Sequence, residues 1–400
     1  MRENWKYQPL GEITTSINGL WKGKKPPFVN VGVIRNANFT KEFTLNLSNI
    51  EYLDVEERQY SSRKLQRGDL IVEKSGGSEK QPVGRTILFD LEGEYSVSNF
   101  TSILRIKDKT SILPTFLYKY LLYIYKEGYT KEMQNATTGI HNIIYDKFLS
   151  IPIPILSLSE QERIVALLDD QFAKIDALKA NAASQLQAAK DLFQSALKEV
   201  FEANRNWKYS YFSEVYPIVM GKTPARADIS LWDKKKETHN LWVSIADISV
   251  NEGKYILDTE EYVSKKAASK MRMVSKGSLL MSFKLTIGKM AFAGEDLFTN
   301  EAIIAIPDNG KYNLRFLYYY LSNYNWSTLT DGAEKVKGKT LNKTSIGKIL
   351  LPILSLPEQE RIAARLDAIS EKVKALQTNY DQTITLCNDL KQSLLKSIFE

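Results

Sequence analysis

The stretch IPILSLSEQERI at residues 153–164 returns almost unchanged as LPILSLPEQERI at residues 351–362, 198 positions later. The spacing then holds without a gap, and Phe399-Glu400 repeats Phe201-Glu202. A repeat of this length in constant register indicates two similar halves, each ending in the same structural device.

Each copy of the repeat predicts a short strand followed by one long helix. Pro154 and Pro352 prevent the helix from beginning earlier, and Pro357 suits a first helical turn, where no amide donor is needed. A serine three residues before a glutamate gives capping-box spacing in both copies. These residues are Ser157 with Glu160 and Ser355 with Glu358. Neither Gly nor Pro interrupts residues 160–202 or 358–400, so each helix should be roughly 65 Å long.

Apolar residues in both helices recur every seven positions, which predicts that the two helices pack on each other as a coiled coil. In the second copy this stripe is Leu366, Val373, Tyr380, Cys387 and Leu394, with Ile369, Leu376 and Leu390 in the alternating position. In the first copy it is Leu168, Ile175, Ala182, Ala189 and Ala196, with Leu178 and Leu192 beside them.

A second landmark shows where each half begins. Asn4-Trp5-Lys6-Tyr7 recurs as Asn206-Trp207-Lys208-Tyr209, directly after the first long helix. We therefore expect an α+β protein with two mixed domains, each a small twisted sheet with short helices, separated by the coiled-coil helices. The predicted boundaries are residues 1–152 for the first mixed domain, 153–203 for the first long helix, 204–350 for the second mixed domain and 351–400 for the second long helix.

The composition favours a globular protein with an acidic partner. Hydrophobic residues make up 43% of the 400, and the formal net charge is +7. No run of 18 apolar residues predicts a membrane span, and residues 1–10 lack the apolar centre of a signal peptide. The single cysteine, Cys387, excludes intramolecular disulfides and cysteine-rich zinc sites, which suits a reducing cytoplasm. His141 and His239 are too few for a histidine-based metal site, and we expect no cofactor.

Polar loops at matching places in the two halves are the candidate binding sites. They are rich in Lys, Arg, Ser, Thr, Asn and Gly, which contact phosphates and read base edges. We therefore expect a DNA interface, although each loop taken alone could be an ordinary solvated loop. The candidate DNA-binding residues are Lys74, Ser75, Lys80, Arg85, Thr138, His141 and Asn142 in the first half, and Lys222, Thr223, Arg226, Lys284, Lys289, Lys337, Lys339 and Asn342 in the second.

Catalytic motifs are missing from the sequence. The segment from Gly332 to Thr340 has one residue too many for a phosphate-binding loop, and Gly76-Gly77-Ser78 lacks the strand–turn–helix setting of a dinucleotide site. Neither a Gly-x-Ser-x-Gly motif nor a methyltransferase motif of the Asn/Asp-Pro-Pro-Tyr type occurs. The sequence therefore favours binding over catalysis. The aromatic helices that follow Phe116 and Phe316 could stack on bases, but we expect them to lie in the core.

Glu-Gln-Glu-Arg-Ile at the head of two long helices, separated by a variable domain, resembles the specificity subunit of type I restriction–modification systems. The resemblance covers the whole chain. It implies two target recognition domains, each reading one part of a split, asymmetric DNA site, on antiparallel coiled-coil helices with pseudo-twofold symmetry. It also implies that two methyltransferase (modification) subunits bind the helices, that restriction subunits complete the complex, and that the chain itself is not an enzyme. The candidate partner-binding residues are Glu160, Gln161, Arg163, Glu358, Gln359 and Arg361.

Two other interpretations remain open from the sequence. The chain could be a coiled-coil structural or protein-interaction module that does not bind DNA, or it could carry a catalytic domain without a recognisable motif. Binding to random-sequence DNA would separate the first from a DNA-reading subunit, and methyl transfer by the chain alone would support the second.

Overall fold

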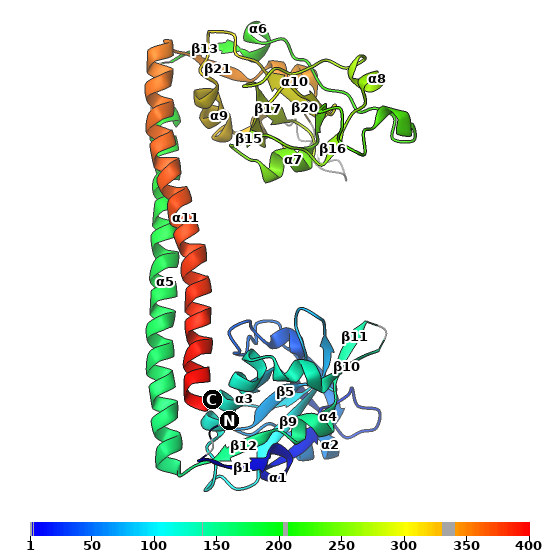
Figure 1. Cartoon of the computed structure of the whole chain (residues 1–400), viewed down its shortest axis with the longest axis vertical. Helices are drawn as coiled ribbons and strands as arrows, with labels where there is room; N and C mark the ends of the chain where they lie inside the picture. Colours follow the sequence, from blue (N-terminus) through cyan, green and yellow to red (C-terminus); the bar gives the residue numbers. More distant parts are fainter. Residues whose placement is uncertain (1, 3, 138, 203–206, 330–340) are drawn as a thin grey trace. The chain divides into compact units, whose positions relative to one another are not determined.

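The computed structural model describes residues 2, 4–137, 139–202, 207–329 and 341–400. The chain divides into two compact units. Unit 1 consists of Met1–Ala183 with Tyr380–Glu400, and unit 2 of Ser184–Asn379. Each unit thus holds one mixed domain, the beginning of one long helix and the end of the other. The helices α5 (Leu158–Glu202) and α11 (Leu356–Phe399) each run from one unit into the other (Figure 1).

The repeated stretch folds in the same way in both units. In unit 1, β12 (Pro152–Ile155) pairs antiparallel with β1 (Lys6–Pro9), and α5 follows. In unit 2, β21 (Leu350–Ile353) pairs with β13 (Lys208–Tyr211), and α11 follows. The Ser157 hydroxyl accepts the backbone N–H of Glu160 at 3.3 Å, whereas the Glu160 carboxylate pairs with Arg163 and does not return to the cap. Pro357 is the second residue of α11, as the sequence predicts.

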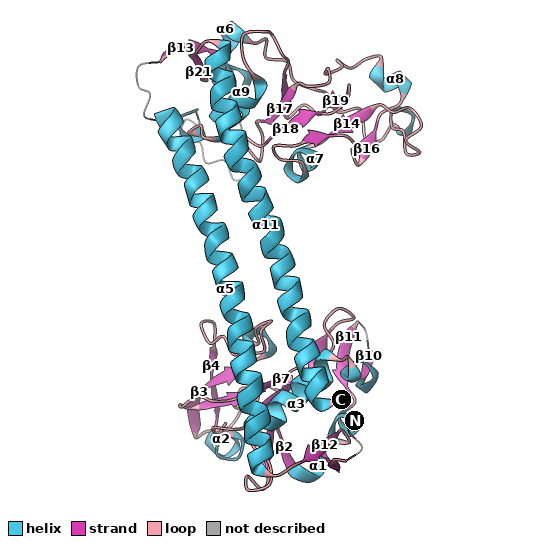
Figure 2. Ribbon diagram, turned by 60° about the vertical axis from the view of Figure 1, so that its left-hand side comes forward, coloured by secondary structure: helices cyan, strands magenta, loops and turns pink. Residues whose placement is uncertain are grey.

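The two long helices pack antiparallel, which confirms the expected fold class (Figure 2). In unit 1, the Lys391 ammonium lies 2.6 Å from the Asp176 carboxylate, and Lys179 donates to the Asn388 side chain at 2.6 Å. In unit 2, Arg365 pairs with Glu199 at 3.1 Å. Residue numbers therefore fall along one helix as they rise along the other.

The predicted second position of the coiled-coil stripe is wrong for three leucines. Leu178, Leu192 and Leu390 are 57%, 63% and 48% exposed. The buried residues of α5 include pairs that are four positions apart rather than three, such as Ile164 with Leu168 and Ala196 with Val200. The reason is that each helix packs against a mixed domain as well as against its partner, which rotates the buried face.

The described residues of unit 1 form four sheets. The strand orders are β1-β12, β2-β9-β5-β7, β4-β3-β8 and β10-β11-β6. The strands other than β1 and β12 are β2 (Thr14–Asn18), β3 (Phe28–Ile34), β4 (Glu51–Glu56), β5 (Leu70–Glu73), β6 (Ser75–Gly77), β7 (Thr86–Leu88), β8 (Tyr95–Val97), β9 (Thr101–Ile106), β10 (Gln134–Thr137) and β11 (Ile140–Ile143). The helices are α1 (Leu10–Ile13), α2 (Glu57–Arg63), α3 (Pro114–Lys126) and α4 (Tyr145–Leu149), besides the long ones.

Unit 2 repeats this plan with shorter strands. Its sheets have the orders β13-β21, β16-β14-β19 and β15-β18-β17-β20. The strands other than β13 and β21 are β14 (Leu241–Val243), β15 (Tyr255–Ile256), β16 (Glu261–Tyr262), β17 (Leu279–Ser282), β18 (Met290–Ala293), β19 (Phe298–Thr299) and β20 (Ile303–Ile306). The short helices are α6 (Phe212–Val215), α7 (Ile245–Val250), α8 (Lys265–Ala268), α9 (Leu314–Ser322) and α10 (Lys343–Gly347).

One β-rich segment of the sequence folds partly as a helix. Residues 241–250 are strand only at β14, and the rest is α7. The Ser244 hydroxyl accepts the backbone N–H of Asp247 at 3.3 Å, and the Asp247 carboxylate accepts the backbone N–H of Ser244 at 2.8 Å. This capping box satisfies two donors of the helix start, which outweighs the β-branched composition of the segment.

The aromatic helices form the core, as expected. In unit 1 the ring of Phe399, at the end of α11, packs edge-on against Tyr120 of α3 with centroids 5.2 Å apart. In unit 2 Phe201, at the end of α5, packs the same way against Tyr320 of α9 at 5.5 Å. Each mixed domain is therefore closed by the last turn of a long helix. None of the described helices is both long and apolar enough to cross a membrane.

Candidate nucleic-acid interface

In unit 1 the two polar loops predicted from the sequence form one small sheet. The strand β11 lies between β10 and β6, with His141 opposite Gly77 and Asn142 opposite Ser75. The Ser75 hydroxyl donates to the Asn142 side-chain oxygen at 2.5 Å. Residues 67 positions apart in the sequence thus share one polar surface. Thr138 lies outside the described residues.

Lys74 lines a cleft of about 410 Å³ at the edge of this surface. Its ammonium donates to the Asn18 side chain at 2.9 Å, and partial burial lowers the Lys74 pKa. Trp21, which is 65% exposed, lines the same cleft together with Asn99. A cation, an aromatic face and side-chain amides in one cleft can together contact a phosphate, a sugar and a base.

Arg85 lies beneath the surface rather than on it. Its guanidinium binds the Glu73 carboxylate through two hydrogen bonds, at 2.7 and 3.0 Å, and stacks over the Phe39 ring. Both side chains are almost fully buried. The Arg85 charge is therefore neutralised within the protein, and the pair fixes the hairpin of β5 and β7. Lys80, by contrast, is exposed in the turn that follows β6.

In unit 2 the candidate residues gather around Glu301. The Thr223 hydroxyl donates to the Glu301 carboxylate. This hydrogen bond lowers the Glu301 pKa, and the nearby charges of Lys284 and Arg226 lower it further. Lys222 is exposed beside Thr223. The structure therefore brings together Lys222, Thr223, Arg226 and Lys284.

Two of the remaining candidates of unit 2 have other partners. Lys289 pairs with Glu252. The Asn342 side chain caps α10 by accepting the backbone N–H of Ser345 at 2.8 Å. Lys337 and Lys339 lie outside the described residues.

In each unit, one tightly packed glycine sets the position of the loop that carries candidate residues. A Cβ atom added to Gly19 would lie 1.8 Å from the Ser98 carbonyl oxygen, and one added to Gly221 would lie 2.1 Å from that of Thr299. Only glycine permits this approach. The loop after Gly19 carries Trp21 and the loop after Gly221 carries Thr223, so the two units display different side chains at one position of the same fold.

The glutamines of the repeat hold each long helix to its mixed domain. The Gln161 side chain accepts the Leu113 N–H at 2.8 Å and donates to the carbonyls of Ser111 and Leu156, both at 2.9 Å. Gln359 accepts the Asn313 N–H at 2.8 Å and donates to the carbonyl oxygens of Lys311 and Leu354. Both glutamines are 0% exposed. They therefore position the helix heads, whereas the paired Glu160 and Arg163 lie at the surface with Glu358 and Arg361 at the equivalent positions.

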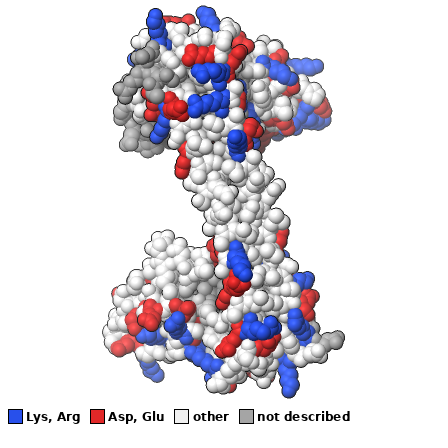
Figure 3. All heavy atoms as spheres, turned by 90° about the vertical axis from the view of Figure 1, so that its left-hand side faces the viewer, with Lys and Arg blue, Asp and Glu red and all other residues white. Residues whose placement is uncertain are grey.

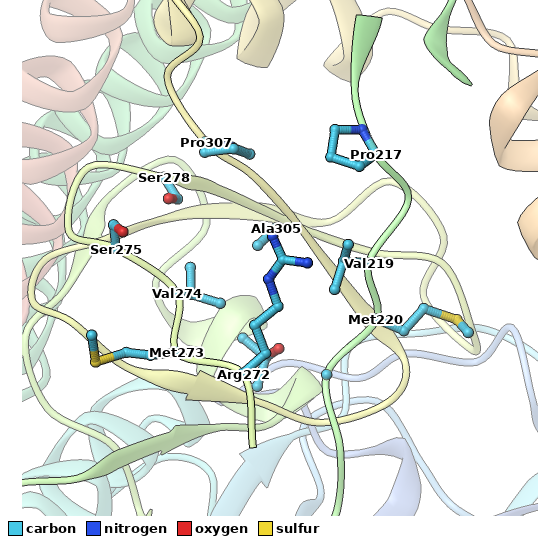
Figure 4. A pocket seen from close by; sticks show the side chains of 12 residues that line it. Pro217, Val219, Met220, Arg272, Met273, Val274, Ser275, Ser278, Ala305 and Pro307 are labelled. Atoms are coloured by element: carbon cyan, nitrogen blue, oxygen red, sulfur yellow. The ribbon is translucent and has the colours of Figure 1, made fainter. Parts of the chain in front are cut away.

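A cavity of about 100 Å³ in unit 2 lies between the segment that contains Met220 and the segment Arg272–Ser275, and the Arg272 side chain extends across it (Figure 4). Among the described residues, no three His, Cys, Asp or Glu side chains are grouped so that they could hold a metal ion.

Sequence reasoning missed the residues whose role depends on tertiary contacts. Glu301, Asn18 and Asn99 are single polar residues that belong to no motif. The one signal near them is that Ser98-Asn99 and Thr299-Asn300 occur at corresponding places in the two halves. The sequence offers one signal for the two glutamines. An uncharged polar residue that recurs between two glutamates at both helix heads indicates the same structural contact in each half.

Comparison with known proteins agrees with this architecture. The type I restriction modification DNA specificity domain matches the chain twice, at residues 2–188 and 204–386. The putative type I restriction enzyme MjaX specificity subunit of Methanocaldococcus jannaschii is 21% identical over 95% of this chain and 90% of its own length. The EcoBI specificity subunit of Escherichia coli is 24% identical over 62% of this chain and 57% of its own.

Solved structures share the fold. A chain from a study of complex assembly and conformational transition of the type I R-M system aligns with a TM-score of 0.76 at 19% identity, over 100% of this chain and 98% of that one. The HsdS subunit from Thermoanaerobacter tengcongensis aligns with a TM-score of 0.58 at 20% identity, over 100% and 97%. With two copies of the domain covering most of its length, the chain belongs to the DNA specificity subunits of type I restriction–modification systems, the non-catalytic component that the sequence predicts.

Proposed function

We propose that the chain reads a split, asymmetric target on double-stranded DNA, with one part of the target read by each unit. The observation that carries this proposal is the equivalence of the glycine-anchored loops, which gives both units one reading position with different side chains. Unit 1 offers Trp21, Lys74 and the surface of β6 and β11. Unit 2 offers Lys222, Thr223, Arg226 and Lys284. Different chemistry at one position supports two different DNA words.

The candidate residues divide by role in this proposal. Lys74, Ser75, Lys80, His141 and Asn142 contact DNA in unit 1, and Thr138 is a further candidate. Arg85 supports their sheet through its pair with Glu73. In unit 2, Lys289 contacts DNA by exchanging its pair with Glu252 for a phosphate. Lys337, Lys339 and Asn342 belong to the segment before α10.

Two modification subunits bind the long helices in this proposal, and restriction subunits complete the complex. Leu178, Leu386 and Leu390 of unit 1 are 57%, 67% and 48% exposed, and the contacts of Lys179 with Asn388 and of Asp176 with Lys391 bring their turns level. Residues 180–189 and 382–388 contain no charge, and the view onto the helices shows mostly uncharged side chains along their middle (Figure 3). Exposed leucines at and beside an uncharged stretch of helix surface suit a partner protein.

Glu160 and Arg163 at the head of α5, and Glu358 and Arg361 at the head of α11, are further partner contacts in this proposal, and Gln161 and Gln359 keep these helix heads in place. The compartment that we propose is the cytoplasm, where the buried thiol of Cys387 stays reduced and chromosomal DNA is accessible.

The proposal is tested by selection from random-sequence DNA with the chain and its modification subunit together. We expect one asymmetric target of two defined parts separated by an undefined spacer. Recovery of unrelated sequences only, or of a single undivided word, would contradict it.

The partner surface has a separate test. Leu390→Lys should weaken capture of the modification subunit without lowering thermal stability, because the side chain is about half exposed. The matched control is Lys174→Ala, which changes an exposed charge on α5 and should leave capture intact.

A further inference from the structure

Two tryptophans hold the loop of residues 222–226 in one conformation. The indole N–H of Trp242 donates to the Lys222 carbonyl at 3.0 Å, and that of Trp232 donates to the Ala225 carbonyl at 3.2 Å. The two indoles contact each other edge to face, with centroids 5.1 Å apart. Thr223 is tied to Glu301 within the same loop. The loop therefore needs little further ordering when it meets a ligand.

Arg226, at the end of this loop, is fixed although it is exposed. Its guanidinium carbon lies 4.2 Å from the ring centroid of Trp232 and 5.0 Å from that of Trp242. One terminal nitrogen, Nη1, pairs with the Glu261 carboxylate. The side chain is still 56% exposed, and it lines a cleft of about 380 Å³ together with Lys236 and Tyr262.

This arrangement suits recognition of a base better than recognition of a phosphate. A phosphate contact requires charge and tolerates a mobile side chain. Bidentate recognition of guanine O6 and N7 requires a planar donor edge in a fixed orientation. The position of the guanidinium over the Trp232 ring restricts its plane, and the pair of Nη1 with Glu261 restricts its rotation within that plane, so that Nε and Nη2 are the nitrogens that can donate to a base.

We propose that Arg226 reads a guanine in the part of the target that unit 2 recognises. Trp232, Trp242 and Glu261 are its positioning residues. This inference rests on the proposed function, since it names one base within the target of unit 2. In unit 1 the equivalent glycine is followed by Trp21 and carries no arginine in the next five positions, so the guanine contact belongs to one half of the target.

Selection from random-sequence DNA with Arg226→Lys tests the proposal. Lysine keeps the charge but not the planar fork, so overall affinity should fall little. The preference for guanine at one position should fall by about 5- to 150-fold, which corresponds to about 1–3 kcal/mol, while the other half of the target stays unchanged. Lys234→Ala, an exposed cation of the same cleft, is the control and should change no base preference.

A second measurement uses the wild-type protein and does not depend on a folded variant. Each guanine of the selected target is replaced in turn by 7-deazaguanine, which lacks the N7 acceptor. One replacement should weaken wild-type binding at least fivefold and weaken binding by Arg226→Lys clearly less, because the lysine ammonium lacks the fixed planar fork.

The outcomes separate a failure of the proposed function from a failure of the guanine contact alone. If the wild-type protein selects no divided target, the proposed function fails. If it selects one and Arg226→Lys selects the same bases with the same preferences, the guanine contact is overturned. If no 7-deazaguanine replacement weakens wild-type binding, or the sensitive one weakens Arg226→Lys equally, the contact is likewise overturned.

Discussion

The side-chain oxygen of Gln161 accepts the backbone N–H of Leu113 at 2.8 Å, in an environment fully closed to solvent. The contact joins the head of α5 to the residue before α3, and Gln359 makes the same contact with Asn313 in unit 2. It explains why a polar residue recurs inside a helix head that must also pack on a core.

Gln161→Ala should therefore destabilise the protein, because three buried backbone groups lose their partner. Each unsatisfied group costs about 1–3 kcal/mol, and we expect a loss of at least about 2 kcal/mol in chemical unfolding. Gln359→Ala should act alike, and the double variant should be additive because the two sites lie in different units. Glu162→Gln, on the exposed face next to Gln161, is the control. Stability equal to that of the control would contradict the positioning role.

Arg85→Ala should destabilise unit 1, because it leaves the buried Glu73 carboxylate without its partner. Removing one partner of a buried ion pair leaves a buried charge, at a cost of about 3–5 kcal/mol. Replacing both partners, as in Glu73→Leu with Arg85→Met, should restore most of the loss. Lys80→Ala, on the exposed turn, should instead weaken DNA binding at unchanged melting temperature and lower the salt slope by about one unit. An Arg85→Ala protein of normal stability that binds DNA weakly would make Arg85 a direct contact.

Residues near the two ends of the chain lie close together in unit 1. The Arg2 guanidinium donates to the Ser397 carbonyl at 2.8 Å. A circular permutant that joins residue 400 to residue 1 and opens near residue 203 should therefore fold and keep its DNA specificity, because Phe201 and Phe399 close their units in the same way. Gel shift and circular dichroism measure this outcome, and an insoluble product with several junction lengths would contradict it.

Acid should weaken the region of unit 2 that carries Arg226. A hydrogen bond from the Tyr262 hydroxyl, at 2.7 Å, lowers the Asp258 pKa below its usual value. A lowered carboxyl pKa gives stability that is present above the unfolded value of about 4 and is lost as the pH falls through the folded value. The melting temperature of the wild type should exceed that of Asp258→Asn at pH 7, and the two should converge toward pH 3. A constant difference would contradict the assignment.

Repeat and periodicity predicted the long helices, the strands before them and the aromatic cores, because these depend on local patterns that occur twice. Heptad spacing did not predict the whole buried face of each long helix. Leu178 and Leu192 are exposed since each helix also packs on a mixed domain, which heptad spacing does not encode. The sheet that joins the loops of β6 and β11 was not predicted from the sequence. The burial of Arg85 depends on Glu73, whose position opposite Arg85 is set by the register of β5 and β7.

We propose that the long helices act as a spacer that sets the distance between the two parts of the target. A continuous helix of 45 residues is about 65 Å long, which limits the separation of the two target parts to at most ~19 base pairs at ~3.4 Å each. The distance between the two parts of the DNA target should therefore depend on the length of the helices and not on the sequence of the loops that contact the DNA.

The most direct measurement is therefore the preferred spacer after deletion of one heptad from each helix, residues 180–186 and 381–387, which lie level in the antiparallel pair. The deletion shortens each helix by about 10 Å, so selection from random-sequence DNA should recover the same two words with a spacer about 3 base pairs shorter. The same two words at the original spacing would contradict the account.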